Sequence, residues 1–300
     1  MLPHADQVET IRTISWMKET VRQARAENHV IGFVPTMGAL HAGHLALVKR
    51  ARQDCSRVVT SIFLNPKQFG PSEDLAKYPR TLEADADKLA GAGVDVLFHP
   101  DAAEMYPPGF ATYVHGQGLS EQLEGRTRPG HFQGVTTVVL KLLEIVQPRY
   151  AYFGRKDAQQ VKLIERMVTD LNLNTEIVVY PIVREADGLA LSSRNVYLSS
   201  GERSAALVLH RALKKVREEI SAGVRDALQL QDAMRQVLAS EPLARVDYAE
   251  IVDAETFEPV IRVRRANFAL MAAYIGKTRL IDNLLIEAAA EDPDKFSFQL

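Results

Sequence analysis

Two histidines three residues apart, His41 and His44, lie in the glycine-containing segment Pro35–His44 (PTMGALHAGH). The segment follows an apolar run typical of a buried strand and leads into a helical pattern, so we expect both rings at the start of a helix. The first backbone N–H groups of a helix bind anions, and Gly38 and Gly43 allow a phosphate to approach the backbone closely. We therefore predict a phosphate-binding turn in which both imidazoles donate hydrogen bonds to the ligand. The alternative is that they only cap the helix.

Three weaker motifs do not predict sites. Gly276–Thr278 is similar to the end of a P-loop, but Met271 stands where the first glycine is required, and we predict a hairpin instead. Gly116–Gly118 begins a dinucleotide fingerprint that fails at Glu121, so nicotinamide binding is not expected. A zinc site at the two histidines lacks both the glutamate of the metalloprotease pattern and a third ligand.

The elements that must position this turn alternate between strand and helix. Short β-branched runs bounded by Gly or Pro predict buried strands, and the segments between them have the periodicity of crossover helices. This order predicts an α/β fold with a Rossmann-like, doubly wound parallel sheet, whose ligand lies beyond the carboxyl ends of the strands. The predicted strands are 29–35, 57–64, 94–98, 150–153 and 176–181, and the predicted helices are 10–26, 43–56, 81–92, 133–146 and 158–171.

A second, smaller α+β domain is expected after residue 182. Two helical stretches (201–222 and 226–239) precede alternating runs at 245–252, 262–274 and 279–286. We predict a catalytic domain over residues 1–182 and a C-terminal domain over 183–300 that closes over the active site, because polar segments between domains often cover ligands. The tail 291–300 is expected to be a surface extension.

Composition excludes several classes of function. The chain has 300 residues, 46% of them hydrophobic and 25% charged, and 36 basic against 38 acidic residues give a net charge of −2. Such a balance is not typical of a protein whose main partner is a nucleic acid or an anionic membrane. The longest apolar run, 268–275, is far shorter than the roughly 18 residues of a spanning helix. Met1–Thr10 does not have the pattern of a signal peptide, and Cys55 cannot form an internal disulfide, so we expect a cytoplasmic protein.

Five blocks in the chain together resemble the pantothenate synthetase (pantoate–β-alanine ligase) family. H-x-G-H at His41–His44 is also similar to the wider superfamily of nucleotidylyl-transfer enzymes, so the other blocks carry the assignment. The resemblance runs from about residue 10 to residue 285. The blocks are Pro35–His44 (PTMGALHAGH), Ser61–Phe69 (SIFLNPKQF), Arg128–Phe132 (RPGHF), Phe153–Gln160 (FGRKDAQQ) and Ser192–Asn195 (SSRN).

The resemblance implies a reaction in two steps that uses ATP. The carboxylate of pantoate attacks the α-phosphorus and pyrophosphate leaves, and the amine of β-alanine then attacks the adenylate to release AMP and pantothenate. Both steps place negative charge on oxygen, so the site needs positioned donors more than a nucleophile. ATP is then a substrate, Mg²⁺ accompanies it, and the family is typically homodimeric.

The resemblance also implies roles for individual residues. His44 and His41 are the expected catalytic donors, and Asp85 is a candidate Mg²⁺ ligand, although the acidic helix face 83–87 could equally be solvated surface. Arg128 and His131 are expected on the side that binds the acid, and residues 65–78 are a candidate cover. The expected ATP-binding residues are Met37, Gly38, Ala39, Leu40, His41, Ala42, Gly43, His44, Gly154, Arg155, Lys156, Asp157, Val183, Leu191, Ser192, Ser193 and Arg194, and the pantoate and β-alanine residues are Gln68 and Gln160.

The chain departs from the family's pattern at three positions. Arg155 stands where the family commonly has Glu and Ala158 where it often has an aromatic residue, so side-chain contacts near the nucleotide are expected to differ while backbone contacts persist. Leu191 replaces the more usual Met, a swap that conserves volume. Two other functions remain open at this point: a nucleotidyltransferase that leaves the nucleotide on its product, and a nucleotide sensor or tRNA-binding relative.

Overall fold

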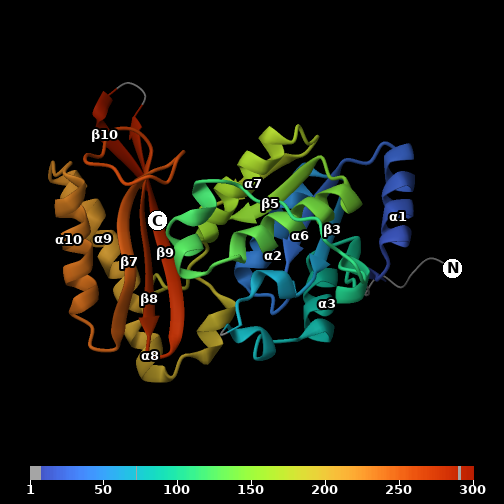
Figure 1. The fold of residues 1–300 in the computed structure, drawn as a ribbon, viewed down its shortest axis with the longest axis horizontal. Helices are drawn as coiled ribbons and strands as arrows, with labels where there is room; N and C mark the ends of the chain where they lie inside the picture. Colours follow the sequence, from blue (N-terminus) through green and yellow to red (C-terminus); the bar gives the residue numbers. More distant parts are fainter. Residues whose placement is uncertain (1–7, 72, 290–291) are drawn as a thin grey trace. The chain divides into compact units, whose positions relative to one another are not determined.

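The computed structural model describes residues 8–71, 73–289 and 292–300. The chain forms two compact units (Figure 1). The N-terminal unit extends to Arg155 and also includes Gln159–Tyr180. The C-terminal unit comprises Lys156–Ala158 and Pro181–Leu300.

The N-terminal unit is built on a six-stranded sheet with the order β1-β4-β3-β2-β5-β6, and every neighbouring pair is parallel. The prediction of a doubly wound α/β fold is confirmed. The strands are β1 (Glu9–Ile11), β2 (Ile31–Thr36), β3 (Arg57–Ile62), β4 (Val96–Phe98), β5 (Tyr150–Gly154) and β6 (Glu176–Tyr180). The main helices are α1 (Ile14–Ala26), α2 (Ala42–Asp54), α3 (Leu82–Gly91), α6 (His131–Val146) and α7 (Ala158–Asp170).

The order of the strands locates the place where a ligand would bind. The chain moves outward from β2 through β3 to β4, and then returns to place β5 on the other side of β2. In open parallel sheets the crevice at such a reversal, beyond the carboxyl ends of the strands, is where ligands bind. The predicted phosphate turn follows β2, and Gly154–Asp157 begins at the last residue of β5. Two predicted ATP segments thus follow adjacent strands at the switch point.

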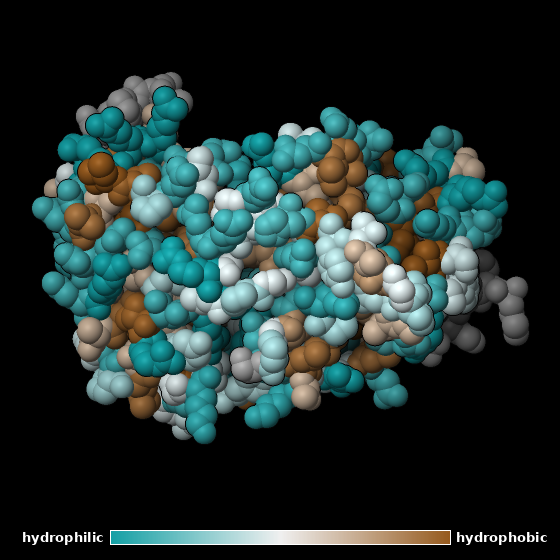
Figure 2. Space-filling model, viewed as in Figure 1, coloured by the Kyte–Doolittle hydropathy of each residue, from teal (hydrophilic) through white to brown (hydrophobic). Residues whose placement is uncertain are grey.

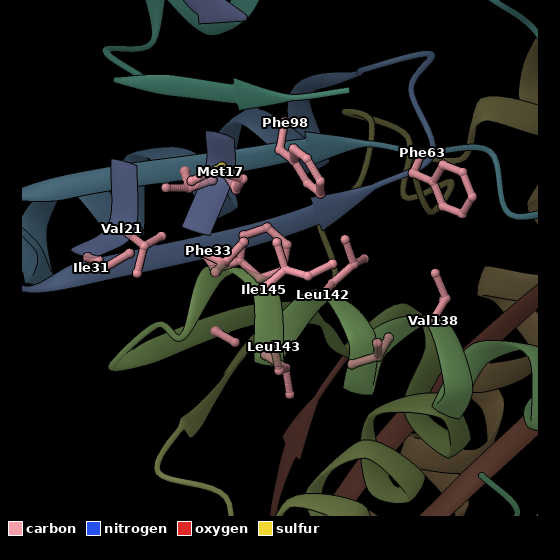
Figure 3. Packing of buried hydrophobic residues seen from close by; sticks show 14 of the residues in the cluster. Met17, Val21, Ile31, Phe33, Phe63, Phe98, Val138, Leu142, Leu143 and Ile145 are labelled. Carbon is pink, nitrogen blue, oxygen red and sulfur yellow. The ribbon is translucent and has the colours of Figure 1, made fainter. Parts of the chain in front are cut away.

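Apolar side chains cover both faces of this sheet. On one face, Met17 and Val21 of α1 and Leu142 and Ile145 of α6 gather around the sheet side chains Phe33 and Phe98 (Figure 3). Burial of each such side chain contributes about 1.5–3 kcal/mol. Because helices lie on both faces, β2 and β3 are buried along nearly their whole length, as the sequence predicts.

The start of the chain differs from the prediction of one helix over residues 10–26. Glu9–Ile11 is a strand that pairs with Val96–Phe98, and α1 begins only after Thr13, whose side chain accepts a hydrogen bond from Trp16 N. A three-residue strand is too short for its alternation to be recognised in a sequence, whereas the adjoining helical pattern is long.

Short elements connect the strands and helices of the N-terminal unit. They are the 3-10 helices η1 (Pro66–Gln68), η2 (Asp74–Ala76) and η3 (Leu119–Glu121) and the one-turn helices α4 (Ala102–Met105) and α5 (Glu124–Thr127). A further 3-10 helix, η4 (Arg155–Asp157), begins in this unit, but Lys156 and Asp157 belong to the C-terminal unit.

The C-terminal unit has a four-stranded antiparallel sheet with the order β10-β9-β8-β7, against which helices α9 and α10 pack. Gly276 and Lys277 form the two-residue turn between β8 and β9, so the predicted hairpin is confirmed and a P-loop is excluded. The elements are η5 (Ser193–Tyr197), α8 (Ser200–Ala205), α9 (Leu207–Ser221), α10 (Ala227–Ala239), β7 (Ala244–Asp253), β8 (Asn267–Ile275), β9 (Thr278–Ala289) and β10 (Asp292–Gln299).

The prediction for the tail is wrong over its described part. Residues 292–299 are not an extension but the edge strand β10, which pairs with β9 through contacts such as Phe298 with Ile286. The aromatic rings of Phe296 and Phe298 are partly buried against the core of this unit. Their alternation with Ser297 and Gln299 is a strand pattern, but it covers only four residues.

Among the described residues, none of the helices combines the length and the apolar character needed to cross a membrane. Hydrophilic residues dominate the face shown in Figure 2, and hydrophobic ones lie between them in small separate patches.

Candidate active site

The turn after β2 has an unusual backbone. Gly38 (φ +85°) and Ala39 (φ +52°) both adopt the left-handed conformation, which is uncommon for a residue with a side chain. The turn reverses the chain between Thr36, the end of β2, and Ala42, the first residue of α2. The turn therefore lies at the carboxyl end of the sheet, where the sequence predicts a phosphate. Its backbone N–H groups differ from the expectation, because those of Gly38, Ala39 and Leu40 donate to side chains of the chain itself.

Asp85, on helix α3, holds this turn. Its side chain is fully buried, and its two carboxylate oxygens accept hydrogen bonds from Ala39 N (2.8 Å) and Leu40 N (2.9 Å). Thr81 Oγ1 donates to the same carboxylate (3.0 Å), and Lys88 Nζ lies 3.5 Å from it. These contacts fix a backbone conformation that would otherwise be strained.

The prediction of Asp85 as a Mg²⁺ ligand does not fit this environment. Both oxygens already accept backbone N–H groups, and within the described residues there is no cluster of three or more His, Cys, Asp or Glu side chains able to hold a metal ion. The alternative of a solvated face holds for Glu83 and Asp87, which are exposed, but not for Asp85. Sequence reasoning missed the role of Asp85 in the turn.

The two histidines form a capping box at the start of α2. His41 is the N-cap, and its Nδ1 accepts from Gly43 N (3.1 Å), while His44 Nδ1 accepts from His41 N (3.3 Å). Because a backbone N–H donates to each Nδ1, that nitrogen carries no proton, and the proton of each neutral ring resides on Nε2. The ring centroids are 4.1 Å apart. The rings therefore cap the helix, and each carries its proton on Nε2.

Gln68 lies beside the same turn. It is buried at the end of η1, which follows β3, and its Nε2 lies 3.1 Å from the sulfur of Met37. Asn65, which caps η1, donates from Nδ2 to Gln68 Oε1 (3.0 Å). The structure thus brings together two predicted site residues, Met37 and Gln68. Asn65, which holds the amide of Gln68, was missed, although an Asn–Pro pair after a strand is a turn signal.

Helix α6 packs against η1, and the two elements are in contact at Gly134. Asn65 Nδ2 donates to Gly134 O (3.1 Å). A Cβ atom added at Gly134 would lie 2.2 Å from Lys67 O and 2.7 Å from Gln68 Cα, so only glycine allows this approach.

We expect Gly134→Ala to destabilise the protein by about 1–3 kcal/mol, because the backbone of η1 would have to move. Helix propensity alone favours alanine over glycine by about 1 kcal/mol and would make the variant more stable. A loss of stability therefore indicates the close contact with η1. Urea unfolding measures it. Gly91→Ala in α3, where an added Cβ meets nothing within 4 Å, is the matched control and should be neutral or stabilising. A stabilised Gly134→Ala variant would contradict the proposed packing.

Arg128, His131 and Glu73 form a polar cluster next to Gln68, in which His131 is buried and the other two are partly buried. His131 Nδ1 lies 2.8 Å from Gln68 O, and Arg128 Nη1 lies 3.0 Å from His131 Nε2. Arg128 also forms two hydrogen bonds of 2.8 Å to the carboxylate of Glu73. Burial, followed by the charge of Arg128, lowers the pKa of His131 to about 4. The ring is therefore neutral at physiological pH.

This depressed pKa predicts a loss of stability in acid. The unfolded chain, in which His131 has its ordinary pKa of 6.5, binds more protons than the folded chain between about pH 6.5 and pH 4. The free energy of unfolding should therefore fall as the pH falls, by about 2 kcal/mol from His131 between about pH 7 and pH 5. Burial also lowers the pKa of His210, which acts in the same direction. Urea unfolding at the two pH values tests this, and equal stability would contradict it.

The segment after β5 contributes to both units. In the N-terminal unit, Gly154 ends β5 and the side chain of Arg155 is buried. In the C-terminal unit, Lys156 O accepts a hydrogen bond from Asn283 Nδ2 (3.0 Å), and Lys156 Nζ lies 3.9 Å from the exposed carboxylate of Asp157.

The two glutamines that open α7 have different environments. Gln159 is buried and donates to Leu119 O (2.8 Å) and Gln122 O (2.9 Å), so its amide holds a loop in place. Gln160, the residue predicted to bind pantoate, is only half-buried.

The remaining predicted residues lie together in the C-terminal unit. Leu191 N donates to Val183 O (3.0 Å) on either side of a small hairpin. Ser192 follows and caps η5 by accepting from Arg194 N (3.2 Å). The hairpin is anchored by Arg184, which donates two hydrogen bonds of 2.8 Å to the buried carboxylate of Asp282.

A family profile and individual proteins that are similar in sequence all indicate the same family. The profile of the family described as Pantoate-beta-alanine ligase matches residues 9–285. The chain is 55% identical over 282 residues to a pantothenate synthetase of Koribacter versatilis, covering 94% of this chain and 97% of that protein. It is 56% identical over 267 residues to a pantothenate synthetase of Chloroflexus aurantiacus, covering 89% and 95% of the two chains.

Solved structures agree with the sequence comparison. A pantothenate synthetase from Thermus thermophilus is similar with a TM-score of 0.88 and 48% identity over 92% of this chain and 98% of that one. A pantoate-beta-alanine ligase from Francisella tularensis, complexed with beta-gamma ATP and beta-alanine, is similar with a TM-score of 0.75 and 37% identity, covering 92% and 97% of the two chains.

Proposed function

Because the chain belongs to the pantoate–β-alanine ligase family, we propose that the turn Met37–His44 is where it cleaves ATP. The enzyme condenses pantoate with β-alanine to give pantothenate in a reaction that consumes ATP. In the first step a carboxylate oxygen of pantoate attacks the α-phosphorus and the bond to the departing pyrophosphate breaks. In the second step the amine of β-alanine attacks the acyl carbon of the adenylate, loses a proton and displaces AMP.

One observation carries the assignment of the phosphate site. Both histidines at the start of α2 hold a proton on Nε2, because backbone N–H groups occupy Nδ1. We propose that these two N–H donors bind the phosphate oxygens as negative charge grows during adenylate formation, with His44 closest to the α-phosphate. Donors fixed in advance need no reorganisation in the transition state, which makes this type of stabilisation effective.

The acid is proposed to bind next to this turn through Gln68 and Gln160. A neutral amide donates to a carboxylate and accepts from a hydroxyl, and pantoate has both groups. The contact between Gln68 Nε2 and Met37 supports this assignment, because it places the amide against the phosphate turn.

ATP is further proposed to contact the segment after β5 and the C-terminal unit. Gly154 and Arg155 would contribute backbone groups, Lys156 a cation for phosphate, Asp157 a partner for ribose, and Val183 a contact to adenine. We propose that Leu191, Ser192, Ser193 and Arg194 bind phosphate, since hydroxyl groups and a guanidinium adapt to a changing phosphate geometry. The C-terminal domain, residues 183–300, would then close over the site and protect the adenylate from water.

Mg²⁺ is proposed to enter with the triphosphate, as is usual for ATP, and no side chain is assigned to it because Asp85 does not fit. We also propose a homodimer in the cytoplasm, with pantoate, β-alanine and ATP as its small-molecule partners.

The test is release of pyrophosphate from ATP with a panel of carboxylic acids, followed by addition of amines. We expect pyrophosphate with pantoate, and AMP from α-labelled ATP only after β-alanine is added. A nucleotidyltransferase would instead leave the label on its product. A nucleotide sensor would release neither product, and a tRNA-binding relative would shift tRNA in a gel.

A further inference from the structure

His131, the first residue of α6, contacts the backbone of Gln68 rather than its side chain. The ring is 8% exposed, and its Nδ1 lies 2.8 Å from the backbone oxygen of Gln68. A carbonyl oxygen only accepts hydrogen bonds, so Nδ1 must carry a proton.

The other nitrogen of the ring is equally determined. Nε2 lies 3.0 Å from Nη1 of Arg128, and a guanidinium only donates and does not lose its proton. Nε2 must therefore be unprotonated. Together the two contacts fix His131 as the neutral tautomer with its proton on Nδ1, which is the reverse of the tautomer of His41 and His44.

We propose that His131 is a positioning residue that sets the orientation of Gln68 for the acid substrate, and that Arg128 keeps His131 in the tautomer required for this task. The inference rests on the proposed role of Gln68 in binding pantoate.

Arg128 is itself rigidly held. Its Nε and Nη2 each donate to one oxygen of Glu73 at 2.8 Å, and Nη1 lies 3.9 Å from Oε2 of Glu124. Glu73 is five residues beyond Gln68 in the chain. The guanidinium of Arg128 therefore links the segment that contains Gln68 and Glu73 to His131 at the start of α6. Because two of its nitrogens are hydrogen-bonded to one carboxylate, the planar guanidinium does not rotate away from the imidazole.

The position of Gln68 is sensitive because its amide contacts two other parts of the site. Nε2 meets Met37 in the phosphate turn and Oε1 accepts from Asn65. A shift of the backbone at Gln68 would therefore move the amide relative to the phosphate turn, and misplacement by about 1 Å costs up to 10²-fold in rate.

Two variants of His131 show whether its hydrogen bond to Gln68 O positions Gln68 or whether the ring only fills space. Asparagine can place an amide donor where Nδ1 lies, whereas the longer glutamine places its amide near Nε2. We expect His131→Gln to raise the KM for pantoate about tenfold with little change in the KM for ATP, and His131→Asn to restore it to within about threefold of the parent. Thermal unfolding of both variants identifies any loss of fold. Equal KM values for the two folded variants, or rescue by glutamine instead of asparagine, would overturn the proposal.

A spectroscopic measurement tests the tautomer without relying on activity. In the full-length protein labelled with ¹⁵N-histidine, the signals of His131 are assigned as those missing from His131→Asn. We expect a protonated Nδ1 and an unprotonated Nε2, with no titration above about pH 5, as a buried neutral ring requires. A proton on Nε2, or titration near the ordinary pKa of histidine, would contradict the proposal.

Gln68→Ala separates failure of this inference from failure of the proposed function. If Gln68→Ala leaves the KM for pantoate unchanged, the proposed role of Gln68 is wrong. If it raises that KM while His131→Gln does not, only the positioning role of His131 is wrong.

Discussion

Replacing His44 by alanine is expected to lower the rate of adenylate formation by about 10²–10³. The substitution removes the Nε2–H donor that we assign to the phosphate oxygens at the moment when their charge grows. The measurement is the rate of pyrophosphate release with saturating ATP and pantoate, before β-alanine is added. Near-normal release would refute the role of His44.

His44 also caps helix α2, so the effect on chemistry must be separated from the effect on folding. Loss of the cap alone costs about 1 kcal/mol. His44→Asn is the matched control, because its side-chain oxygen can accept from His41 N in place of Nδ1, but it lacks a donor where Nε2 lies. We expect His44→Asn to recover thermal stability and to remain about as slow as His44→Ala. Recovery of both stability and rate would mean that His44 acts only as a cap.

Asp85→Asn is expected to destabilise the protein by about 3–5 kcal/mol and to slow adenylate formation by about 10–10². The carboxylate accepts two backbone N–H groups, and an amide offers only one oxygen, so its NH₂ group would face a buried N–H. The turn through Gly38 and Ala39 would then relax from its left-handed conformation and move the histidines. Urea unfolding and pyrophosphate release measure the two effects.

Asp87→Asn is the matched control, since Asp87 is exposed on the same helix and the charge change is identical. It should change stability by less than about 0.5 kcal/mol. Full rescue of Asp85→Asn by a high concentration of Mg²⁺, with stability unchanged, would instead indicate that Asp85 is a metal ligand.

Sequence patterns predicted most of the fold because the central strands are buried on both faces. Short runs rich in apolar or β-branched residues, such as Ile31–Thr36 and Arg57–Ile62, are separated by helices of ordinary length and leave few alternatives to a parallel sheet. The two strands that were missed, β1 and β10, lie at sheet edges and are either very short or only briefly alternating. Edge strands have less apolar surface to bury, so their sequences carry a weaker signal.

The candidate site was predictable where its residues are adjacent in sequence, and not where folding brings distant residues together. The turn after Ile31–Thr36 and the place of its histidines at the start of a helix follow directly from the pattern of strand, glycine and helix. Asp85, which is 46 residues from Ala39, could not be connected with that turn, because its sequence neighbours suggest an acidic helix surface. The same applies to His131, which is 63 residues from Gln68.

The capping box of α2 couples the tautomer of both histidines to the folding of the helix. The hydrogen bonds that begin the helix are the same ones that decide which nitrogen of each imidazole holds the proton. When the first turn of α2 forms, both rings already have the tautomer in which we propose that they bind a triphosphate, so no proton would have to move between the ring nitrogens when the nucleotide binds. A loop with this sequence transplanted into another scaffold would therefore work only if the helix were transplanted with it.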